Sequence, residues 1–576
     1  MKLIIKEYLG LLLEREELDA ILPDLLSQMG LNVYTKPMRG TPEFGVDIAA
    51  VGSINNGVES VYLFSVKEGN LTRSTWLSSS PQSLKPSLEQ ILDAYIPSRI
   101  PPEHIDKPIV ICPCFGGDVN TNVKQDLAGY EKRNTQGNIS FENWNGDKLA
   151  GYIEDYLLNE ELLTSPLQSL FRKSLALIDN PEASIKHFII LLNMILEYKS
   201  IDEPKRLSQI NVCLWILYSW GRDLGNIETA YLAAEKSILF AWEIAKKDQG
   251  KNNKNMKAYY SILNTYNKIS SDYIENKILP YTNIKHGISV AIGLQSDVSV
   301  NLKLFDLLSR LAIYGLHLQN KLFTLKPEEN KNIIDKIKKC TSSIKEMIIN
   351  NPLLLSPYKD DQAIDIFLAL YLLSYDNEHD SFVAEWISHL INLSFISYTG
   401  NAKYPSNINK FYELLEHPAS TDIKYKHKVT KASILYPTLA IFSALYKLDN
   451  LNDEILKFVN QHFQHCTMLY WYPKDDSEHH FYIKNKLHGA ELTSIQLDKD
   501  KLLDQVFNEC QSSNDFFNLS IIKQKLEPIL LTACRSNRTP VPLHVLCDFY
   551  ESSFINNKET TKQINADVQP SNSNTV

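Results

Sequence analysis

The chain has 576 residues, a formal net charge of −9 at pH 7, and 44% hydrophobic and 22% charged residues. This length is too great for one hydrophobic core, so we expect two to four domains. The acidic balance argues against broad nonspecific binding to nucleic acid, which needs a concentrated basic surface. No stretch approaches the roughly 18 uninterrupted apolar residues of a membrane span. The eight irregularly spaced cysteines indicate reduced thiols, so we expect a soluble cytoplasmic protein.

The first part of the chain alternates helical and strand patterns. A helix with apolar positions from Leu11 to Met29 ends at Gly30, and the short strand LNVYTKP follows. The segments VDIAAVG and ESVYLFSVKEG, separated by the turn signal Asn55-Asn56-Gly57, predict a hairpin. Further helices and strands alternate through SLEQILDAYI, HIDKPIVICPC, VKQDLAGYEKRN, NISFENW and GDKLAGYIEDYLL. This order predicts an α/β domain over residues 1–160, with a mixed sheet flanked by helices.

Helical patterns dominate from about residue 165 onward. Segments such as PEASIKHFIILLNMILEY and VNLKLFDLLSRLAIYGLHLQNKL show a 3.6-residue period without a fixed repeat length, so an α-solenoid and an irregular bundle both fit. We expect an all-α region over 165–465. The segment CTMLYWYPKDDSEHHFYIKNKLHGAELTSIQL predicts a small β insertion in a second helical region, 466–556. The polar residues 557–576 predict a disordered tail.

Two residues of the expected hairpin have the chemistry of a metal-dependent phosphodiesterase. Asp47 and Lys67 lie on its two paired strands, which can present both side chains together. Carboxylates supply the hard oxygen ligands that magnesium prefers, and a bound cation neutralises developing charge and lowers the pKa of water. A lysine beside it orients the water or stabilises the transition state.

The same segment resembles a known family. GTPEFGVDI, a turn and YLFSVKEG are similar to the PD-(D/E)xK superfamily, especially its Mrr-like and Holliday-resolvase-like members, and SFENWNGDKLAGYI resembles the closing elements of Mrr-like domains. The resemblance covers about a quarter of the chain and implies a restriction-endonuclease-like fold. It implies that Lys67 is catalytic and that Asp47 binds metal. Further metal ligands implied by the resemblance are Ser65, the backbone carbonyl of Val66, and an acid of the first helix, either Glu17 or its neighbour Glu14.

Position 65 departs from the family pattern. The family has Glu, Asp or Gln two residues before the lysine, whereas this chain has Ser65, a neutral and poorer magnesium ligand. We therefore carry two hypotheses. The first is a Mg²⁺- or Mn²⁺-dependent endonuclease, acting on DNA in preference to RNA as an effector of prokaryotic antiviral defence, whose helical region binds a protein partner or a second copy. The alternative is a catalytically inactive adaptor whose helical array mediates protein–protein interaction.

Two further groups of residues are weaker candidates. Basic residues near Lys67 either surround one phosphate site or are scattered solvated charges; they are Lys36, Arg39, Arg73 and Lys85. A zinc site could be assembled from four of six residues around the β insertion, but their irregular spacing favours side chains that bind no metal. The six residues are His462, His465, Cys466, His479, His480 and His488. The sequence contains no P-loop, GxSxG or Rossmann glycine pattern.

Overall fold

The chain forms two compact units, Met1–Ile269 and Ser270–Val576. A computed structural model describes residues 2–36, 44–55, 57–78, 83–157, 165–198, 202–246, 254–293, 296–322, 330–473, 477–479, 481–483, 490–494, 497–512 and 515–547. Within these ranges, no helix combines the length and apolar character needed to cross a membrane. The domain limits expected from the sequence stay predictions, and the expected disordered tail, 557–576, lies outside the described residues.

A five-stranded mixed sheet forms the framework of the first unit. Its strands are β1 (Asn32–Thr35), β2 (Ile48–Gly52), β3 (Ser60–Lys67), β4 (Ile109–Phe115) and β5 (Ile139–Phe141), in that spatial order. β2 pairs antiparallel with both β1 and β3, whereas β3–β4 and β4–β5 are parallel. The prediction of an N-terminal mixed sheet flanked by helices is therefore confirmed.

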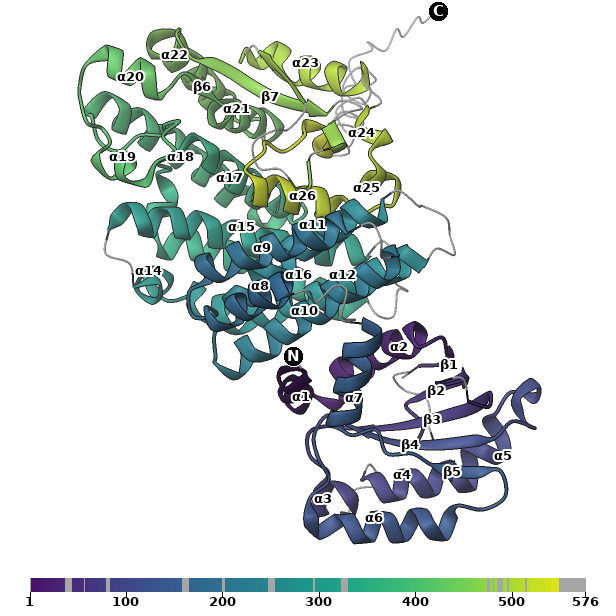
Figure 1. Cartoon of the computed structure of the whole chain (residues 1–576). Helices are drawn as coiled ribbons and strands as arrows, with labels where there is room; N and C mark the ends of the chain where they lie inside the picture. The colour runs from purple at the N-terminus through teal and green to yellow at the C-terminus, as the bar shows by residue number, and fades with distance from the viewer. Residues whose placement is uncertain are drawn as a thin grey trace, which may run out of the picture. The chain divides into compact units, whose positions relative to one another are not determined.

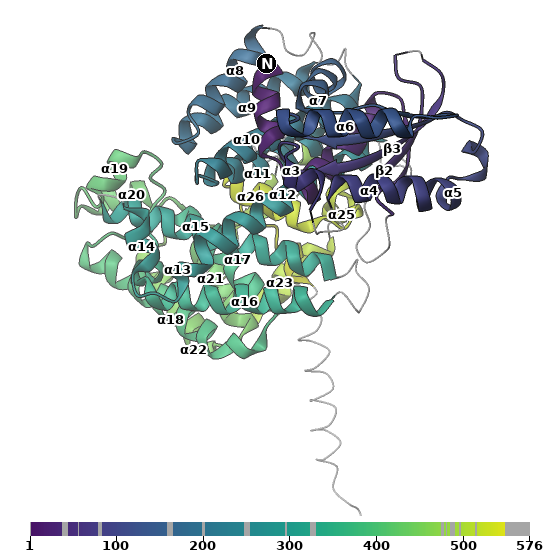
Figure 2. The same cartoon turned by 90° about the horizontal axis from the view of Figure 1, so that it is seen from below.

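Helices cover both faces of this sheet (Figure 1). One layer contains α1 (Lys2–Leu11), α2 (Asp19–Gln28) and α7 (Gly146–Tyr152); the other contains α3 (Arg73–Trp76), α4 (Leu84–Gln90), α5 (Ile96–Arg99) and α6 (Thr121–Asn134). Seen from below, α4 and α6 lie in front of β2 and β3 (Figure 2). Both faces of β3 are buried: Val61 and Leu63 pack in the core shared with α4 and α6. On the other face the Phe64 ring meets Trp144 edge-on at 4.9 Å.

The first helix is broken, and the prediction of one continuous helix up to Gly30 was wrong. α1 ends at Leu11, a five-residue π-helical turn called η1 (Glu14–Leu18) follows, and α2 begins at Asp19. Leu13, between them, has extended backbone angles, with φ −72° and ψ 153°. η1 packs against β3 as a result. Gly30 does adopt the expected left-handed conformation after α2, with φ 87°.

Five longer helices follow: α8 (Ser165–Ala176), α9 (Pro181–Glu197), α10 (Glu203–Asp223), α11 (Glu228–Ala245) and α12 (Lys254–Tyr273). The first unit ends within α12, at Ile269. Both α1 and α2 pack against α10. A polar chain links these helices: Ser261 Oγ donates to Asp24 Oδ2 at 2.9 Å, and Asn211 Nδ2 donates to Ser261 Oγ at 3.0 Å. α2 is thereby held to α10 and α12.

The second unit is mostly helical, as the sequence predicts. Its helices are α13 (Leu279–Thr282), α14 (Gly287–Ile292), α15 (Asp297–Leu322), α16 (Asn330–Asn350), α17 (Ala363–Leu373), α18 (Asp380–Gly400), α19 (Phe411–Glu416), α20 (Ile423–Val429), α21 (Leu435–Leu445), α22 (Asp449–His462), α23 (Lys499–Ser512), α24 (Asp515–Asn518), α25 (Ser520–Lys523) and α26 (Glu527–Asn537). α15 packs against α16, α17 and α26. The predicted β insertion is confirmed by β7 (Thr467–Pro473), which pairs antiparallel with β8 (Ala490–Ser494) and parallel with β6 (Ala432–Ser433).

Candidate active site

Asp47 lies directly before β2, and its carboxylate is held against β3. The Asp47 N–H donates to the carbonyl of Phe64 at 2.9 Å, so the hairpin pairing continues to this residue. The N–H of Val66 donates to Asp47 Oδ2 at 2.6 Å. A hydrogen bond between a backbone amide and a carboxylate is charge-assisted and orients the acceptor. The Asp47 carboxylate is thus fixed beside the residue that precedes Lys67.

Lys67 ends β3 and is nearly buried, with 8% of its surface exposed. Its ammonium Nζ lies 3.0 Å from Oε1 of Glu14, and Glu14 is the first residue of η1. A buried ammonium needs such a partner because desolvation penalises an isolated charge. The Glu14 side chain is 27% exposed, so the ion pair reaches toward solvent. The structure brings Lys67 together with Glu14, the second of the two acids considered from the sequence.

Glu17, the first of those two acids, is bound elsewhere. It is fully buried, and its Oε2 accepts a hydrogen bond from the Leu13 N–H at 2.8 Å. The guanidinium of Arg222, on α10, contacts both carboxylate oxygens, with Nη2 3.1 Å from Oε2. Lys268 Nζ, on α12, lies 3.8 Å from Oε1. Glu17 therefore anchors η1 to the helices of the first unit.

The electrostatics of this anchor favour a charged pair. Burial by itself lowers the pKa of Arg222, but the Glu17 carboxylate outweighs that effect and the pKa is raised above its ordinary value. Because Glu14 and Glu17 belong to the same short turn, the Glu17–Arg222 pair also fixes the backbone that carries Glu14. Arg222 was not anticipated: it lies 205 residues from Glu17 and stands in an unremarkable helix end.

Ser65 is fully buried, and its hydroxyl makes no hydrogen bond to any residue that the structure describes. It pairs in register with Pro113 of β4. The pairing of β2 with β3 ends at Ile48 and Phe64, one residue short of Asp47 and Ser65. Asp47 contacts β3 through two hydrogen bonds, one to the Phe64 carbonyl and one from the Val66 amide. Ser65 thus lies in sequence between the two β3 residues that Asp47 contacts.

The possible metal ligands near Asp47 are all oxygen atoms, which suits a hard divalent cation. Mg²⁺ is commonly held by one or two protein carboxylates, with waters and substrate phosphate completing its shell. The Asp47 carboxylate, the Val66 carbonyl and the Ser65 hydroxyl fit that description, whereas the Glu14 carboxylate is paired with Lys67. Among the described residues, no three His, Cys, Asp or Glu side chains gather into a ready ligand set.

The two cysteines of β4 behave as structural thiols. Cys112 and Cys114 are fully buried. Burial, with the Asp47 carboxylate as the second cause, raises the pKa of the Cys114 thiol. A thiol held protonated in this way is a weak nucleophile and a weak metal ligand. The cysteines therefore add packing to the site and no obvious chemistry.

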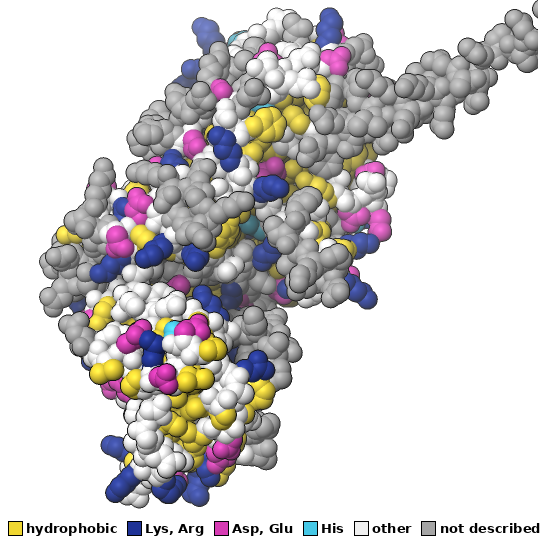
Figure 3. Space-filling model, turned by 90° about the vertical axis from the view of Figure 1, so that its right-hand side faces the viewer, with side chains coloured by type: hydrophobic (Ala, Val, Ile, Leu, Met, Phe, Trp, Pro, Cys, Tyr) yellow, Lys and Arg dark blue, Asp and Glu magenta, His cyan; other side chains and the backbone are white. Residues whose placement is uncertain are grey.

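The other residues considered from the sequence are dispersed. Lys85 pairs with Glu89 at 3.7 Å, Lys36 and Arg73 are exposed, and Arg39 lies outside the described residues. Figure 3 shows basic and acidic side chains interspersed over the described part of one face.

His465 stacks on His427 with ring centroids 3.7 Å apart and shares a hydrogen bond with Thr430. His480 and His488 are also outside the described residues, as is the side chain of His479.

Comparisons with known proteins identified no relative of this chain. No protein-family model matches the sequence, and the searches of curated proteins and of solved structures found no significant match. The site itself consists of a buried lysine, Lys67, paired with Glu14, and of the Asp47 carboxylate held by the amide of Val66.

Proposed function

We propose that the α/β part of the first unit is a metal-dependent nuclease, with Asp47, Glu14 and Lys67 as its working groups. One observation carries the proposal: the Lys67 ammonium pairs with Glu14 at 3.0 Å, while the amide one residue earlier holds Asp47 at 2.6 Å. An acid and a lysine thus belong to one end of the β2–β3 hairpin, and a second acid, from η1, pairs with the lysine. The resemblance of this hairpin to the PD-(D/E)xK superfamily supports the same conclusion.

Each group has a distinct role in this proposal. Asp47, the Val66 carbonyl and Ser65 would hold Mg²⁺ or Mn²⁺, which when bound neutralises phosphate charge and lowers the pKa of water. The Val66 amide presets the orientation of the Asp47 carboxylate. Lys67 supplies positive charge that stabilises a phosphorane-like transition state. Glu14 is a positioning residue for Lys67.

The wider role follows from the resemblance. We propose that the substrate is DNA in preference to RNA, and that the protein is a cytoplasmic effector of antiviral defence. The helical regions would bind a protein partner or a second copy of the chain. An assembly of two copies would supply two sites, as cleavage of both strands of a duplex requires.

Ser65 favours a second candidate function. A fully buried neutral hydroxyl stands where the resembled family has a second acidic ligand. Without that ligand, the domain would serve as an inactive adaptor whose helices mediate protein–protein interaction.

The first test is cleavage of plasmid DNA and of RNA in Mg²⁺ or Mn²⁺ by the full chain. Asp47→Ala and Lys67→Ala should each reduce cleavage by at least about 100-fold, since each removes a group that acts on the transition state. Lys107→Ala is the matched control, because Lys107 pairs with Glu59 at the opposite end of β3. Full cleavage by either site variant would refute the proposal.

Ser65→Glu separates the two candidate functions. If the domain is a nuclease weakened at this position, the added carboxylate should increase cleavage, and Asp47→Ala should abolish the gain. If the wild type and Ser65→Glu are both silent in every condition while remaining folded by circular dichroism, the adaptor is favoured.

A further inference from the structure

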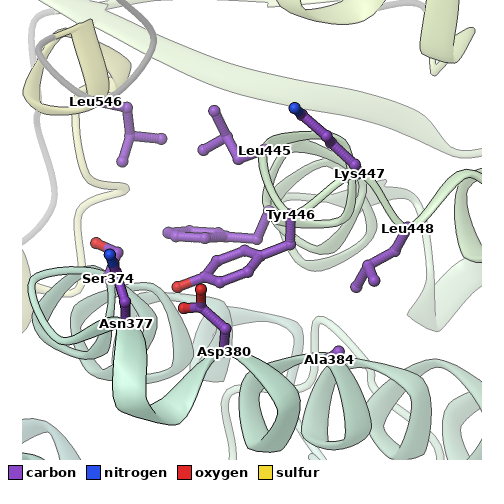
Figure 4. Close-up of a pocket in the computed structure, with 10 residues that line it drawn as sticks. Ser374, Asn377, Asp380, Ala384, Leu445, Tyr446, Lys447, Leu448 and Leu546 are labelled. Carbon is purple, nitrogen blue, oxygen red and sulfur yellow. The ribbon is translucent and has the colours of Figure 1, made fainter. Parts of the chain in front are cut away.

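A cavity of about 450 Å³ opens in the second unit, between the α17–α18 connection and the end of α21 (Figure 4). Ser374, Asn377 and Asp380 line one side, and Phe442 and Tyr446 line the other. The cavity is built from segments that are distant in sequence, and the side chains lining it are both polar and apolar. Its volume is within the range of about 300–1,000 Å³ that is typical of small-molecule sites.

One end of the cavity is an acceptor for N–H groups. The Tyr446 hydroxyl and the Asp380 carboxylate point toward one another (Figure 4). The Tyr446 hydroxyl is buried and forms no hydrogen bond within the described part of the chain. Burial and then the neighbouring Asp376 raise the pKa of Asp380, with only His379 acting in the other direction. Asp380 is an exposed residue, so its carboxylate can accept an N–H group from a ligand.

The remaining walls suit a flat apolar body. Leu445 and Leu448 come from the end of α21 and the turn after it, and Leu546 comes from the short helix η11 (Leu543–Leu546). Phe442 contributes an almost fully buried aromatic ring. A planar heterocycle placed among these side chains would contact apolar surface.

A cation lies at the rim of the same cavity. Lys447 is exposed and occupies the left-handed position that closes α21, with φ 57°. Glycine is the residue favoured at such a position, because any side chain adds strain there. The lysine keeps a positive charge at the mouth of a cavity whose opposite end is acidic. Lysine side chains are common partners of phosphate groups.

We propose that this cavity binds a purine nucleotide, with the base directed to Asp380 and Tyr446 and the phosphate to Lys447. The amino group of adenine, or the amino group and ring N–H of guanine, matches a carboxylate acceptor, and the phenol hydroxyl of Tyr446 can donate to a ring nitrogen. The apolar walls match the faces of the base. A simple amine would satisfy Asp380 but would be repelled by Lys447 and would leave much of the volume unfilled. The proposal is independent of the nuclease activity, since it concerns the second unit alone.

Isothermal titration calorimetry of GMP and AMP into the full chain tests this inference. We expect one of the two nucleotides to bind at one site per chain. Asp380→Asn should weaken binding by at least about tenfold, because it removes a charged acceptor. Lys447→Gly should weaken nucleotide binding and reduce its salt dependence, while leaving binding of the free nucleoside nearly unchanged. Glycine is compatible with φ 57°, so this variant should fold normally.

Glu385→Gln is the matched control, because Glu385 lies on the exposed side of α18, pairs with His389 at 3.7 Å and does not line the cavity. Its affinity should equal that of the wild type. Absence of binding by both nucleotides at millimolar concentration would overturn the proposal. Equal affinity in Asp380→Asn would also overturn it, as would binding of spermidine in place of either nucleotide.

Discussion

The ion pair at Lys67 in the first unit and the cluster around Asp306 in the second unit hold their charges in different ways. In the first unit, Lys67 meets the single carboxylate of Glu14, whose side chain is 27% exposed. In the second unit, Asp306 on α15 is shared by Arg310 at 2.6 Å, Arg535 at 2.8 Å and Lys303 at 3.6 Å. Burial raises the pKa of Asp306, but these three cations outweigh it and hold the pKa well below its ordinary range. The Asp306 side chain is itself 35% exposed, so the difference lies in the number of partners. A carboxylate shared among three cations is a structural tie, whereas a lysine with a single partner keeps charge available for a ligand.

The comparison predicts the largest loss of stability when the tie in the second unit is cut. Arg535 is 5% exposed and also donates from Nε to Ser309 Oγ at 3.1 Å. Arg535→Ala should lower the free energy of unfolding of the second unit by about 2–3 kcal/mol, because it removes a buried side chain and its hydrogen bond to a charged partner, while Asp306 keeps Arg310 and Lys303. Urea unfolding followed by circular dichroism measures this. Lys410→Ala, which removes an exposed pair with Glu413, is the control and should stay within about 0.5 kcal/mol of the wild type.

Removal of the Glu17–Arg222 ion pair, which anchors η1, should lower the free energy of unfolding by a smaller amount. Arg222→Ala leaves the buried Glu17 with the Leu13 amide and Lys268, so we expect a loss of about 2 kcal/mol in the first unit. The same variant should slow cleavage by about tenfold, because the turn that carries Glu14 is no longer fixed. Lys257→Ala, on the exposed surface of α12, should change neither quantity. A stability loss without any change in cleavage would show that the anchor does not act on Glu14.

Mild acid should weaken the second unit through its buried histidines. Burial lowers the pKa of His317 to about 3 and that of His417 to about 4. Both side chains are neutral in the folded protein, whereas the unfolded chain takes up protons near its ordinary pKa of 6.5. Their stabilisation is therefore complete above pH 6.5 and is lost as pH falls toward 4. Between pH 7 and pH 5 we expect about 2 kcal/mol of loss for each histidine.

Hydrogen exchange at pH 7 and pH 5 locates this effect. Amides of α15, which carries His317, should lose protection at the lower pH after correction for intrinsic exchange rates. In urea unfolding, His417→Asn should reduce the pH dependence of the free energy of unfolding by the contribution of one histidine. Unchanged protection of α15 between the two pH values would contradict the assignment.

The smallest stability effect should come from Lys67 itself. Lys67→Met keeps the length and the apolar stem of the side chain and releases Glu14 to solvent. We expect the free energy of unfolding to change by less than about 1 kcal/mol, since partly exposed ion pairs contribute little. Cleavage should nevertheless be lost. A large destabilisation here would mean that the Lys67–Glu14 pair is a structural tie like that of Asp306.

The hairpin could be predicted from the sequence because its signals are local. Alternating apolar residues in ESVYLFSVKEG and the Asn-rich turn define two strands, and the order of the flanking segments defines a mixed sheet. The break at Leu12 and Leu13 had only a weak signal, since Gly10 stands near the end of α1 but no proline follows it there. Continuous helical periodicity therefore suggested one helix. It gave no basis for predicting that Glu14 pairs with Lys67 while Glu17 pairs with Arg222.

The remaining features depend on contacts between distant segments. Arg222 reaches Glu17 across 205 positions, and no local pattern identifies that pair. The cavity of the second unit combines the α17–α18 connection, the end of α21 and Leu546. Asp380 and Lys447 are ordinary charged residues in the sequence, and only the packing of these helices gives them a common cavity.

Binding of Mn²⁺ to the full chain, followed by electron paramagnetic resonance, examines the proposed active site without any assumption about substrate. The wild type should bind Mn²⁺ at one site per chain, and Mg²⁺ should displace it. Asp47→Ala should lose that site, while Lys107→Ala should retain it. Binding of equal affinity and stoichiometry in Asp47→Ala would contradict the assignment of Asp47 as a metal ligand, and with it the proposed nuclease.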